Sequence, residues 1–281
     1  MKILVTGSSG FIGKAFCDYA SRFGNEIIYY DLPKQNILNH KMLRKIIYDC
    51  DLVYHFAAMA DLNESLKNQN RNFEVNIRGT YNIARSCYKA RKKLIFISTC
   101  CVYGNREGIE EETVLPLTIE PYACSKVAGE YIIRGIAELN YIVARIGTVY
   151  GIGMRKELFN YIVLDSIINE KLLKINGNGK QTRQYIYIDD LIKGLYLLKD
   201  LKQNREIINL CGIEKISVLD TIQIAQDITG KKAKKILGDE RYGEIEKENI
   251  SIEKAEKLLN WKPEITYEIG MKKSYLWMKG L

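Results

Sequence analysis

Two spacings of apolar residues alternate along the first half of the chain. One is a short continuous run, rich in β-branched and aromatic residues, which predicts a buried strand. The other repeats apolar residues every three or four positions and predicts a helix with one buried face. The predicted strands are residues 2–6, 26–31, 51–58, 94–99 and 141–147. The predicted helices are residues 11–24, 40–50, 72–92 and 121–139.

The order of these elements predicts the fold class. Strands and helices alternate and no hairpin signal joins two strands, so we expect an α/β fold with a doubly wound parallel sheet covered on both faces. The second half is less regular. Residues 177–191 combine a glycine turn, a strand and a helix opened by Asp189 or Asp190. Further along we predict a strand at residues 206–210 and helices at residues 217–230, 251–259 and 267–279.

Composition indicates an ordinary folded chain without a metal centre. The 281 residues are 47% hydrophobic and 27% charged, which argues against disorder. No apolar run approaches the roughly 18 residues of a membrane span, and the N-terminus turns glycine-rich too soon for a signal peptide. The seven cysteines form no C-x-x-C pair and the two histidines are His40 and His55, so the spacing of zinc ligands is absent. Scattered cysteines in odd number predict a reduced, cytoplasmic protein.

The net charge of +8 leaves two interpretations open. Basic clusters at residues 91–93 and 231–235 are either a solvated surface or part of a field that attracts phosphate-bearing ligands. No nucleic-acid-binding motif accompanies them, so we expect no nucleic-acid partner.

The segment "TGSSGFIG" joins the first predicted strand to the first helix. It places Gly7, Gly10 and Gly13 in a G-x-x-G-x-x-G pattern, with Phe11 and Ile12 opening the helix. Glycines allow backbone N–H groups and a helix N-terminus to approach a phosphate closely. Asp31 ends the next strand, where a carboxylate accepts hydrogen bonds from both hydroxyls of an adenosine ribose and repels a 2′-phosphate. We therefore predict NAD rather than NADP, although Lys34 nearby weakens the distinction.

"PYACSK" places Tyr122 and Lys126 four residues apart, on one face of a predicted helix. A free tyrosine has a pKa of about 10 and is a poor base at neutral pH. An ammonium and an oxidised nicotinamide would both stabilise the phenolate, which could then exchange a proton with a sugar hydroxyl. Thr99, at the end of the preceding strand, could hydrogen-bond the same oxygen. Among 19 tyrosines this spacing also arises by chance, and a threonine at a strand end is usually structural.

Eight segments in order resemble one family. They are "TGSSGFIG", "HFAA", "NIRGTYNIA", "ISTCCVYG", "PYACSK", "ARIGTVYG", "GNGKQTRQYIYIDD" and "KAEKLLNWKP". The same order is found in extended short-chain dehydrogenase/reductases that act on nucleotide sugars, the NAD-dependent epimerase/dehydratase enzymes. The resemblance spans nearly the whole chain, and it makes chance a poor explanation for Tyr122 and Lys126.

The resemblance implies roles for individual residues. Thr99, Tyr122 and Lys126 correspond to the catalytic residues, and Asn76 corresponds to a structural helper at the cofactor site. The residues implied in contacts with adenine, pyrophosphate and nicotinamide ribose are Asn36, Ile37, Ala57 and Ala58.

Three further residues are implied in substrate binding. Arg183 and Arg241 resemble arginines that clamp the sugar diphosphate, a role that suits the planar guanidinium. Arg241 could equally be a solvated loop arginine. Thr148 stands where many relatives have an asparagine that touches the substrate, which puts the details of that contact in doubt.

Cys100 and Cys101 depart from the family pattern in a way that narrows the reaction. Relatives that dehydrate at C5–C6 carry an Asp-Glu pair directly after the catalytic threonine, and decarboxylases keep the Glu. Neutral thiols cannot replace a carboxylate that removes or delivers a proton, so we expect neither reaction. Packing is the favoured role of the cysteines themselves, with redox sensitivity as the alternative.

These observations predict a Rossmann domain at residues 1–150, with residues 184–212 returning to it. A smaller substrate-binding lobe would comprise residues 151–183 and 213–281. The predicted function is an NAD-dependent nucleotide-sugar 4-epimerase that passes through a transient 4-keto sugar. A 4-keto nucleotide-sugar reductase using NAD(P)H and a non-catalytic dinucleotide sensor are the alternatives. By resemblance, the chain forms a homodimer through the helices near residues 72–92 and 121–139, with no membrane partner.

Overall fold

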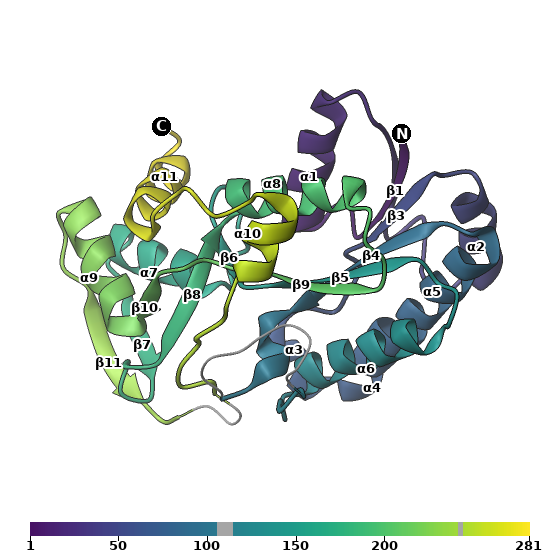
Figure 1. Cartoon of the computed structure of the whole chain (residues 1–281). Helices are drawn as coiled ribbons and strands as arrows, with labels where there is room; N and C mark the ends of the chain where they lie inside the picture. The colour runs from purple at the N-terminus through teal and green to yellow at the C-terminus, as the bar shows by residue number, and fades with distance from the viewer. Residues whose placement is uncertain (106–114, 241–243) are drawn as a thin grey trace.

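The computed structural model describes residues 1–105, 115–240 and 244–281 (Figure 1). In this part of the chain, six strands form a parallel sheet in the order β2-β1-β3-β4-β5-β9. The strands are β1 (Lys2–Thr6), β2 (Glu26–Tyr30), β3 (Leu52–His55), β4 (Lys93–Thr99), β5 (Tyr141–Ile146) and β9 (Glu206–Leu210). From β1 the chain first adds β2 on one side and then β3 on the other. The sheet therefore has its switch point between β1 and β3, where open α/β sheets bind ligands.

Helices cover both faces of the large sheet, which confirms the predicted fold class (Figure 1). β1 shows why both faces need cover, since Ile3 and Val5 join one buried cluster while Leu4 joins the other. The first cluster includes apolar residues of α1 (Phe11–Arg22) and α8 (Ile188–Leu197). The second includes residues of α2 (His40–Tyr48), α5 (Gly79–Ala90) and α6 (Pro121–Gly135).

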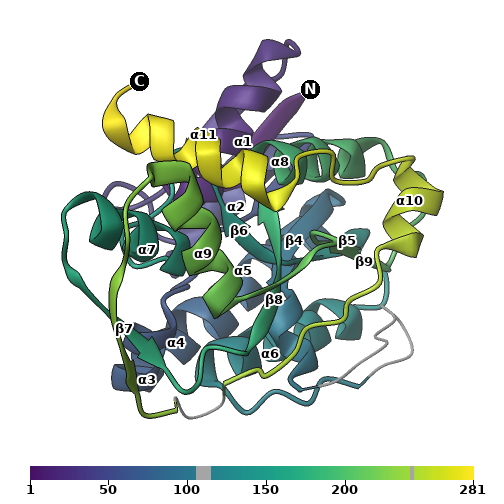
Figure 2. The ribbon, with the colours of Figure 1, turned by 90° about the vertical axis from the view of Figure 1, so that its left-hand side faces the viewer.

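A smaller lobe lies beyond the carboxyl end of the sheet (Figure 2). Its strands form a three-stranded sheet in the order β10-β8-β6 and a parallel pair of β7 and β11. The strands are β6 (Thr148–Tyr150), β7 (Leu172–Asn176), β8 (Thr182–Tyr187), β10 (Lys215–Ser217) and β11 (Lys234–Gly238). Besides α8, the α-helices after residue 150 in the described part of the chain are α7 (Phe159–Ile168), α9 (Val218–Thr229), α10 (Glu253–Leu259) and α11 (Tyr267–Lys279). We propose the domain division predicted above, although β8 pairs within the small sheet rather than the large one.

The helix predicted at residues 72–92 is divided into three parts. α4 (Gln69–Phe73) leads into a π-helical turn, η1 (Glu74–Arg78), and α5 follows. The π turn carries Asn76, and π turns are frequent at functional sites. Short helical segments that the apolar pattern did not predict are α3 (Leu62–Lys67), η2 (Cys100–Tyr103) and η3 (Leu198–Asp200).

A buried ion pair joins α6 to the centre of the large sheet. The guanidinium of Arg145 on β5 donates from Nε and Nη2 to the two carboxylate oxygens of Glu130, at 3.0 and 2.6 Å. Both side chains are 2% exposed, and Ser98 donates to the same carboxylate. Because α6 also carries Tyr122 and Lys126, this pair helps to fix the helix against the sheet.

We predict that Glu130→Ala lowers the free energy of unfolding by about 3–5 kcal/mol, because it leaves the buried guanidinium without its carboxylate. Chemical denaturation monitored by circular dichroism measures the change. The control is Glu264→Ala, which removes an exposed partner of Lys193 and should leave stability nearly unchanged. Equal effects of the two substitutions would contradict the prediction.

Candidate active site

A cavity of about 580 Å³ opens at the carboxyl ends of the parallel strands. The strands β1 to β5 each supply lining residues at or just after their last residue, as the switch-point rule predicts. The volume of the cavity is typical of a small-molecule binding site. The cavity brings together these predicted residues: Gly7, Gly10, Phe11, Ile12, Gly13, Asp31, Asn36, Ile37, Ala57, Ala58, Thr99, Tyr122, Lys126 and Thr148. Their individual roles remain predictions.

The glycine loop has no room for side chains at two of its three glycines. A Cβ on Gly7, whose φ is +71°, would lie 2.6 Å from the backbone nitrogen of Ala57. A Cβ on Gly13 would lie 2.1 Å from the carbonyl oxygen of Gly7. The loop therefore packs directly on the segment after β3, and α1 begins against it at Phe11. This cradle of backbone at a helix N-terminus fits the pyrophosphate of a dinucleotide.

Asp31 lies beside the glycine loop and is held by it. One carboxylate oxygen accepts hydrogen bonds from the backbone N–H of Ser9, at 2.8 Å, and from the Ser9 hydroxyl. Lys34 is exposed and is not among the residues that line the cavity. The arrangement supports the preference for a ribose with two free hydroxyls.

The first turn of α6 is positioned by its cap. The carboxylate of Glu120 accepts from the backbone N–H groups of Tyr122 and Ala123 at 3.0 and 2.9 Å, and Pro121 occupies the first helical position. Tyr122 and Lys126 therefore lie one turn apart on a helix whose first turn is fixed by this cap. Thr99 ends β4, and its hydroxyl oxygen accepts from the backbone N–H of Cys101 at 3.2 Å.

Burial sets the charge states of the tyrosine and the lysine. Lys126 is 3% exposed, and burial lowers its pKa to about 7. Burial also raises the pKa of Tyr122, which the guanidinium of Arg155 opposes in part. The lowered phenol pKa that the sequence suggested is therefore not produced by the chain alone. A cationic ligand ring in the cavity would have to supply the remaining stabilisation of the phenolate.

Cys100 and Cys101 lie where the sequence placed them, directly after Thr99, and both line the cavity. Burial raises the pKa of Cys101 to about 11 and holds that of Cys100 well above its ordinary value. Both are therefore neutral thiols at pH 7. They do not provide the carboxylate chemistry that dehydration requires.

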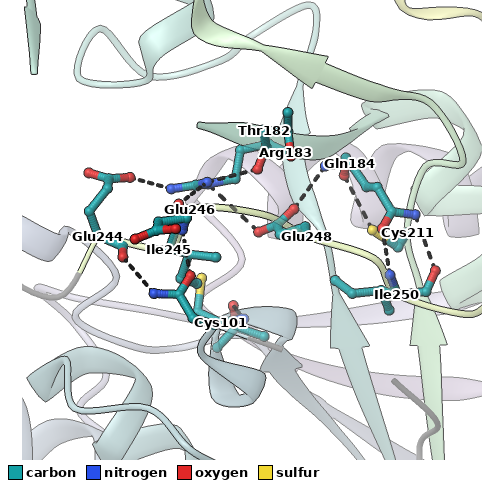
Figure 3. A network of polar contacts seen from close by, with 12 residues as sticks. Cys101, Thr182, Arg183, Gln184, Cys211, Glu244, Ile245, Glu246, Glu248 and Ile250 are labelled. Atoms are coloured by element: carbon teal, nitrogen blue, oxygen red, sulfur yellow. Dashed lines mark hydrogen bonds and ion pairs between the residues drawn. The ribbon is translucent and has the colours of Figure 1, made fainter. Parts of the chain in front are cut away.

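Two predicted site residues lie outside the cavity lining, and the structure does not describe a third. Asn76 is buried outside the cavity lining, where its amide bonds the backbone of Met59 and the hydroxyl of Ser125. Arg183 is also absent from the lining, because its guanidinium donates to the Ile245 carbonyl and pairs with carboxylates (Figure 3). Arg241 lies outside the described residues.

The lining residues that were not predicted from the sequence include two charged ones, Arg155 and Glu248. Arg155 follows the lobe's first strand and lies close enough to Tyr122 to lower the pKa of its phenol. Its place just after a strand end was a usable signal. Glu248 reaches the cavity from the C-terminal segment and is 5% exposed. No local pattern marks it, because only the tertiary fold brings it near Thr99.

Two other kinds of feature are absent from the described residues. Residues 1–105, 115–240 and 244–281 contain no group of three or more His, Cys, Asp or Glu side chains arranged to hold a metal ion. In the same ranges, no helix combines the length and apolar character needed to cross a membrane.

The fold and the cavity define a dinucleotide-binding α/β protein in which a tyrosine and a lysine line the cavity. The family model described as "NAD dependent epimerase/dehydratase family" matches residues 3–211. The chain belongs to this family, which confirms the resemblance seen in its motifs.

Characterised relatives match over nearly their whole length. A UDP-glucuronate 4-epimerase of Thermodesulfobacterium geofontis is 32% identical over 310 residues, which cover 98% of this chain and 95% of that protein. The solved structure of UDP-glucuronic acid 4-epimerase from Bacillus cereus, with UDP-glucuronic acid and NAD, is 30% identical with a TM-score of 0.93 and covers 100% of this chain and 99% of that one. A Thermotoga maritima UDP-glucose 4-epimerase with UDP-glucose is 26% identical with a TM-score of 0.93, at 100% and 99% coverage.

The pKa of Lys126 makes stability depend on pH. Folded protein releases this proton near pH 7 and unfolded protein near pH 10.5, so the unfolded state binds more protons between these values and stability rises with pH there. We predict that Lys126→Met raises the melting temperature of cofactor-free protein at pH 7 and flattens its rise towards pH 10. Thermal melts at several pH values measure both. A variant as steeply pH-dependent as the wild type would contradict the assignment.

Proposed function

We propose that this protein is an NAD-dependent nucleotide-sugar 4-epimerase acting through a transient 4-keto sugar. The observation that carries the proposal is the meeting of Thr99, Tyr122 and Lys126 with the glycine loop in one cavity. The relatives named above are 4-epimerases, and the Bacillus cereus structure holds NAD with its UDP-sugar. We therefore propose NAD as the cofactor and a UDP-sugar as the substrate.

The side chains fit a reversible proton transfer at the 4-hydroxyl of the sugar. The phenolate of Tyr122 accepts the hydroxyl proton, and the Thr99 hydroxyl bonds the same oxygen and holds it toward the phenol. Bound NAD supplies an acceptor and then a donor of the hydride at C4. Tyr122 returns the proton after the 4-keto sugar has turned its other face. Arg155 supplies positive charge that favours the phenolate within the chain.

The reductase alternative uses the same side chains for one net hydride transfer. Asp31 beside the glycine loop disfavours NADP, which such reductases often prefer, and the relatives named above are epimerases. One assay distinguishes the epimerase from the reductase. An epimerase converts UDP-sugars without added cofactor, whereas a reductase consumes reduced nicotinamide in proportion to a 4-keto nucleotide sugar.

We predict that Tyr122→Phe lowers kcat for UDP-sugar epimerisation by roughly 10²–10⁴-fold, the usual contribution of a general base. Mass spectrometry of ligand released on denaturation should still find NAD, because the cradle is untouched. Tyr131→Phe is the matched control on the same helix, since Tyr131 is 49% exposed and outside the cavity. Full activity of Tyr122→Phe would remove the proposed mechanism.

We also propose that the chain forms a homodimer through α5 and α6. These helices pack side by side and leave aromatic side chains on their outer surface, with Tyr81 and Tyr88 two turns apart on α5 and Tyr131 on α6. Partly exposed tyrosines at this spacing suit a helix–helix interface.

Tyr131→Glu is predicted to shift the mass measured by light scattering from dimer toward monomer, because it places a charge in the apolar contact. Tyr29→Glu is the control, since Tyr29 is 55% exposed on edge strand β2. A wild-type protein that is monomeric at micromolar concentration would rule out this assembly.

A further inference from the structure

A chain of buried hydrogen bonds joins the cavity wall after β3 to the first turn of α6. Its middle link is Ser125, which is 0% exposed and to which the sequence motifs gave no role. The Ser125 hydroxyl donates to the carbonyl oxygen of Tyr122 at 2.6 Å. The same hydroxyl oxygen accepts from Nδ2 of Asn76 at 2.9 Å. One serine thus connects the backbone of Tyr122 to the π-helical turn η1.

The other end of the chain is the backbone of Met59. Oδ1 of Asn76 accepts the Met59 N–H at 2.8 Å, and Nδ2 of the same amide donates to the Met59 carbonyl at 3.1 Å. The buried Asn72 donates to that carbonyl as well, at 3.3 Å. Met59 lies between Ala58 and Ala60, and both alanines line the cavity. The wall proposed for the cofactor is therefore fixed at the residue in its centre.

The direction of each hydrogen bond in the chain is defined. The Met59 N–H identifies Oδ1 as the acceptor end of the Asn76 amide, so the two hydrogens on Nδ2 go to the Met59 carbonyl and to Ser125. The one hydroxyl proton of Ser125 then goes to the Tyr122 carbonyl. An alanine at position 125 would remove this last bond and leave a buried N–H of Asn76 without its acceptor, while the bonds between Asn76 and Met59 remain.

The backbone of Tyr122 is held from its other side by the helix cap. The Glu120 carboxylate accepts the Tyr122 N–H, and the buried Ser65 hydroxyl donates to the same carboxylate at 2.9 Å. Side-chain contacts matter most at this position, because the first turn of a helix lacks part of its backbone hydrogen bonds and frays. The phenol oxygen stands at the far end of a long side chain. A small rotation of the Tyr122 backbone therefore moves this oxygen further than it moves the backbone.

We propose that Ser125 is a positioning residue that sets the place of the Tyr122 phenol relative to the bound cofactor and sugar. This inference rests on the proposed function, because it takes Tyr122 as the group that exchanges the proton. A hydroxyl that only completes the helix would affect stability, whereas a positioning hydroxyl affects the rate of proton transfer. Its removal lowers kcat but preserves NAD binding, since the Asn76 bonds to Met59 and the glycine loop are untouched.

The test compares Ser125→Ala with Ser274→Ala in the full-length, NAD-bound protein. Ser274 is the matched control, because it is also 0% exposed and donates to a carbonyl of its own helix, that of Gly270 on α11, at 2.8 Å. Epimerisation of UDP-glucose and of UDP-glucuronate gives KM and kcat, with kcat expressed per NAD released on denaturation. Ser125→Cys keeps a group of similar shape that hydrogen-bonds only weakly, and it carries the test if Ser125→Ala does not fold.

We expect Ser125→Ala to lower kcat by roughly 10–100-fold, the cost of misplacing a reacting group by about 1 Å, while KM stays near its wild-type value. Ser125→Cys should fall between wild type and Ser125→Ala, and Ser274→Ala should keep the wild-type kcat. If kcat per bound NAD is unchanged in Ser125→Ala, the serine is only structural and the proposal is overturned. A rise in KM without a fall in kcat also overturns it.

Failure of the proposed function is a separate result. If the wild-type protein epimerises neither sugar, the 4-epimerase assignment is lost, and hydrogen exchange of the NAD-bound protein still decides whether Ser125 holds Tyr122. Exchange should become faster in Ser125→Ala at residues 121–126 and stay unchanged at residues 57–60. Equal exchange at residues 121–126 in wild type and Ser125→Ala would show that the serine does not fix this turn.

Discussion

The site depends on a backbone contact that admits no side chain. The loop after β1 lies against the segment after β3 so closely that a Cβ on Gly7 would overlap the Ala57 backbone, and α1 is held by the same loop at Gly13. Because β1 and β3 are neighbours at the switch point, this contact closes one end of the cavity and exposes backbone N–H groups at a helix N-terminus. The remaining parts of the site are arranged around that cradle.

The side chains of Tyr122 and Lys126 are buried at this cavity, and burial disfavours the charged form of each. Burial raises the pKa of the Tyr122 phenol and lowers that of the Lys126 ammonium, so the protein alone favours the neutral form of both. A positively charged cofactor ring, when bound, would favour the phenolate and reverse part of this balance. The buried pair of Glu130 and Arg145 holds α6 in place while the side chains one and two turns earlier remain unfavourably buried. Glu130 thus stabilises one part of the helix, while the proposed reactive side chains lie on another.

The sequence predicted the first half of the fold well because the spacing of its apolar residues matches the way each strand and helix is buried. Each strand buried on both faces gives a continuous apolar run, and each helix between strands has one apolar face. The pattern failed where local and tertiary constraints differ. The apolar spacing of residues 72–92 continues across the π turn, and β7 and β11, which pair with each other in a two-stranded sheet, were not predicted. Motifs placed the cofactor loop and Tyr122, but they did not show that Arg183 is occupied by carboxylates or that Arg155 faces the phenol.

The position of a carboxylate, and not only its presence, decides what it can do in this cavity. A carboxylate at position 101 would stand on η2, two residues after the proposed catalytic Thr99, and would line the cavity. Here that place holds a neutral thiol, and the nearby carboxylate belongs to Glu248, tied to the backbone N–H of Gln184 and facing Arg183. Burial raises the pKa of the Glu248 carboxyl, whereas the Arg183 guanidinium and the Gln184 N–H favour its ionised form. The place that a proton-transferring carboxylate would take is therefore held by a neutral thiol, and the proposed proton transfer is left to Tyr122.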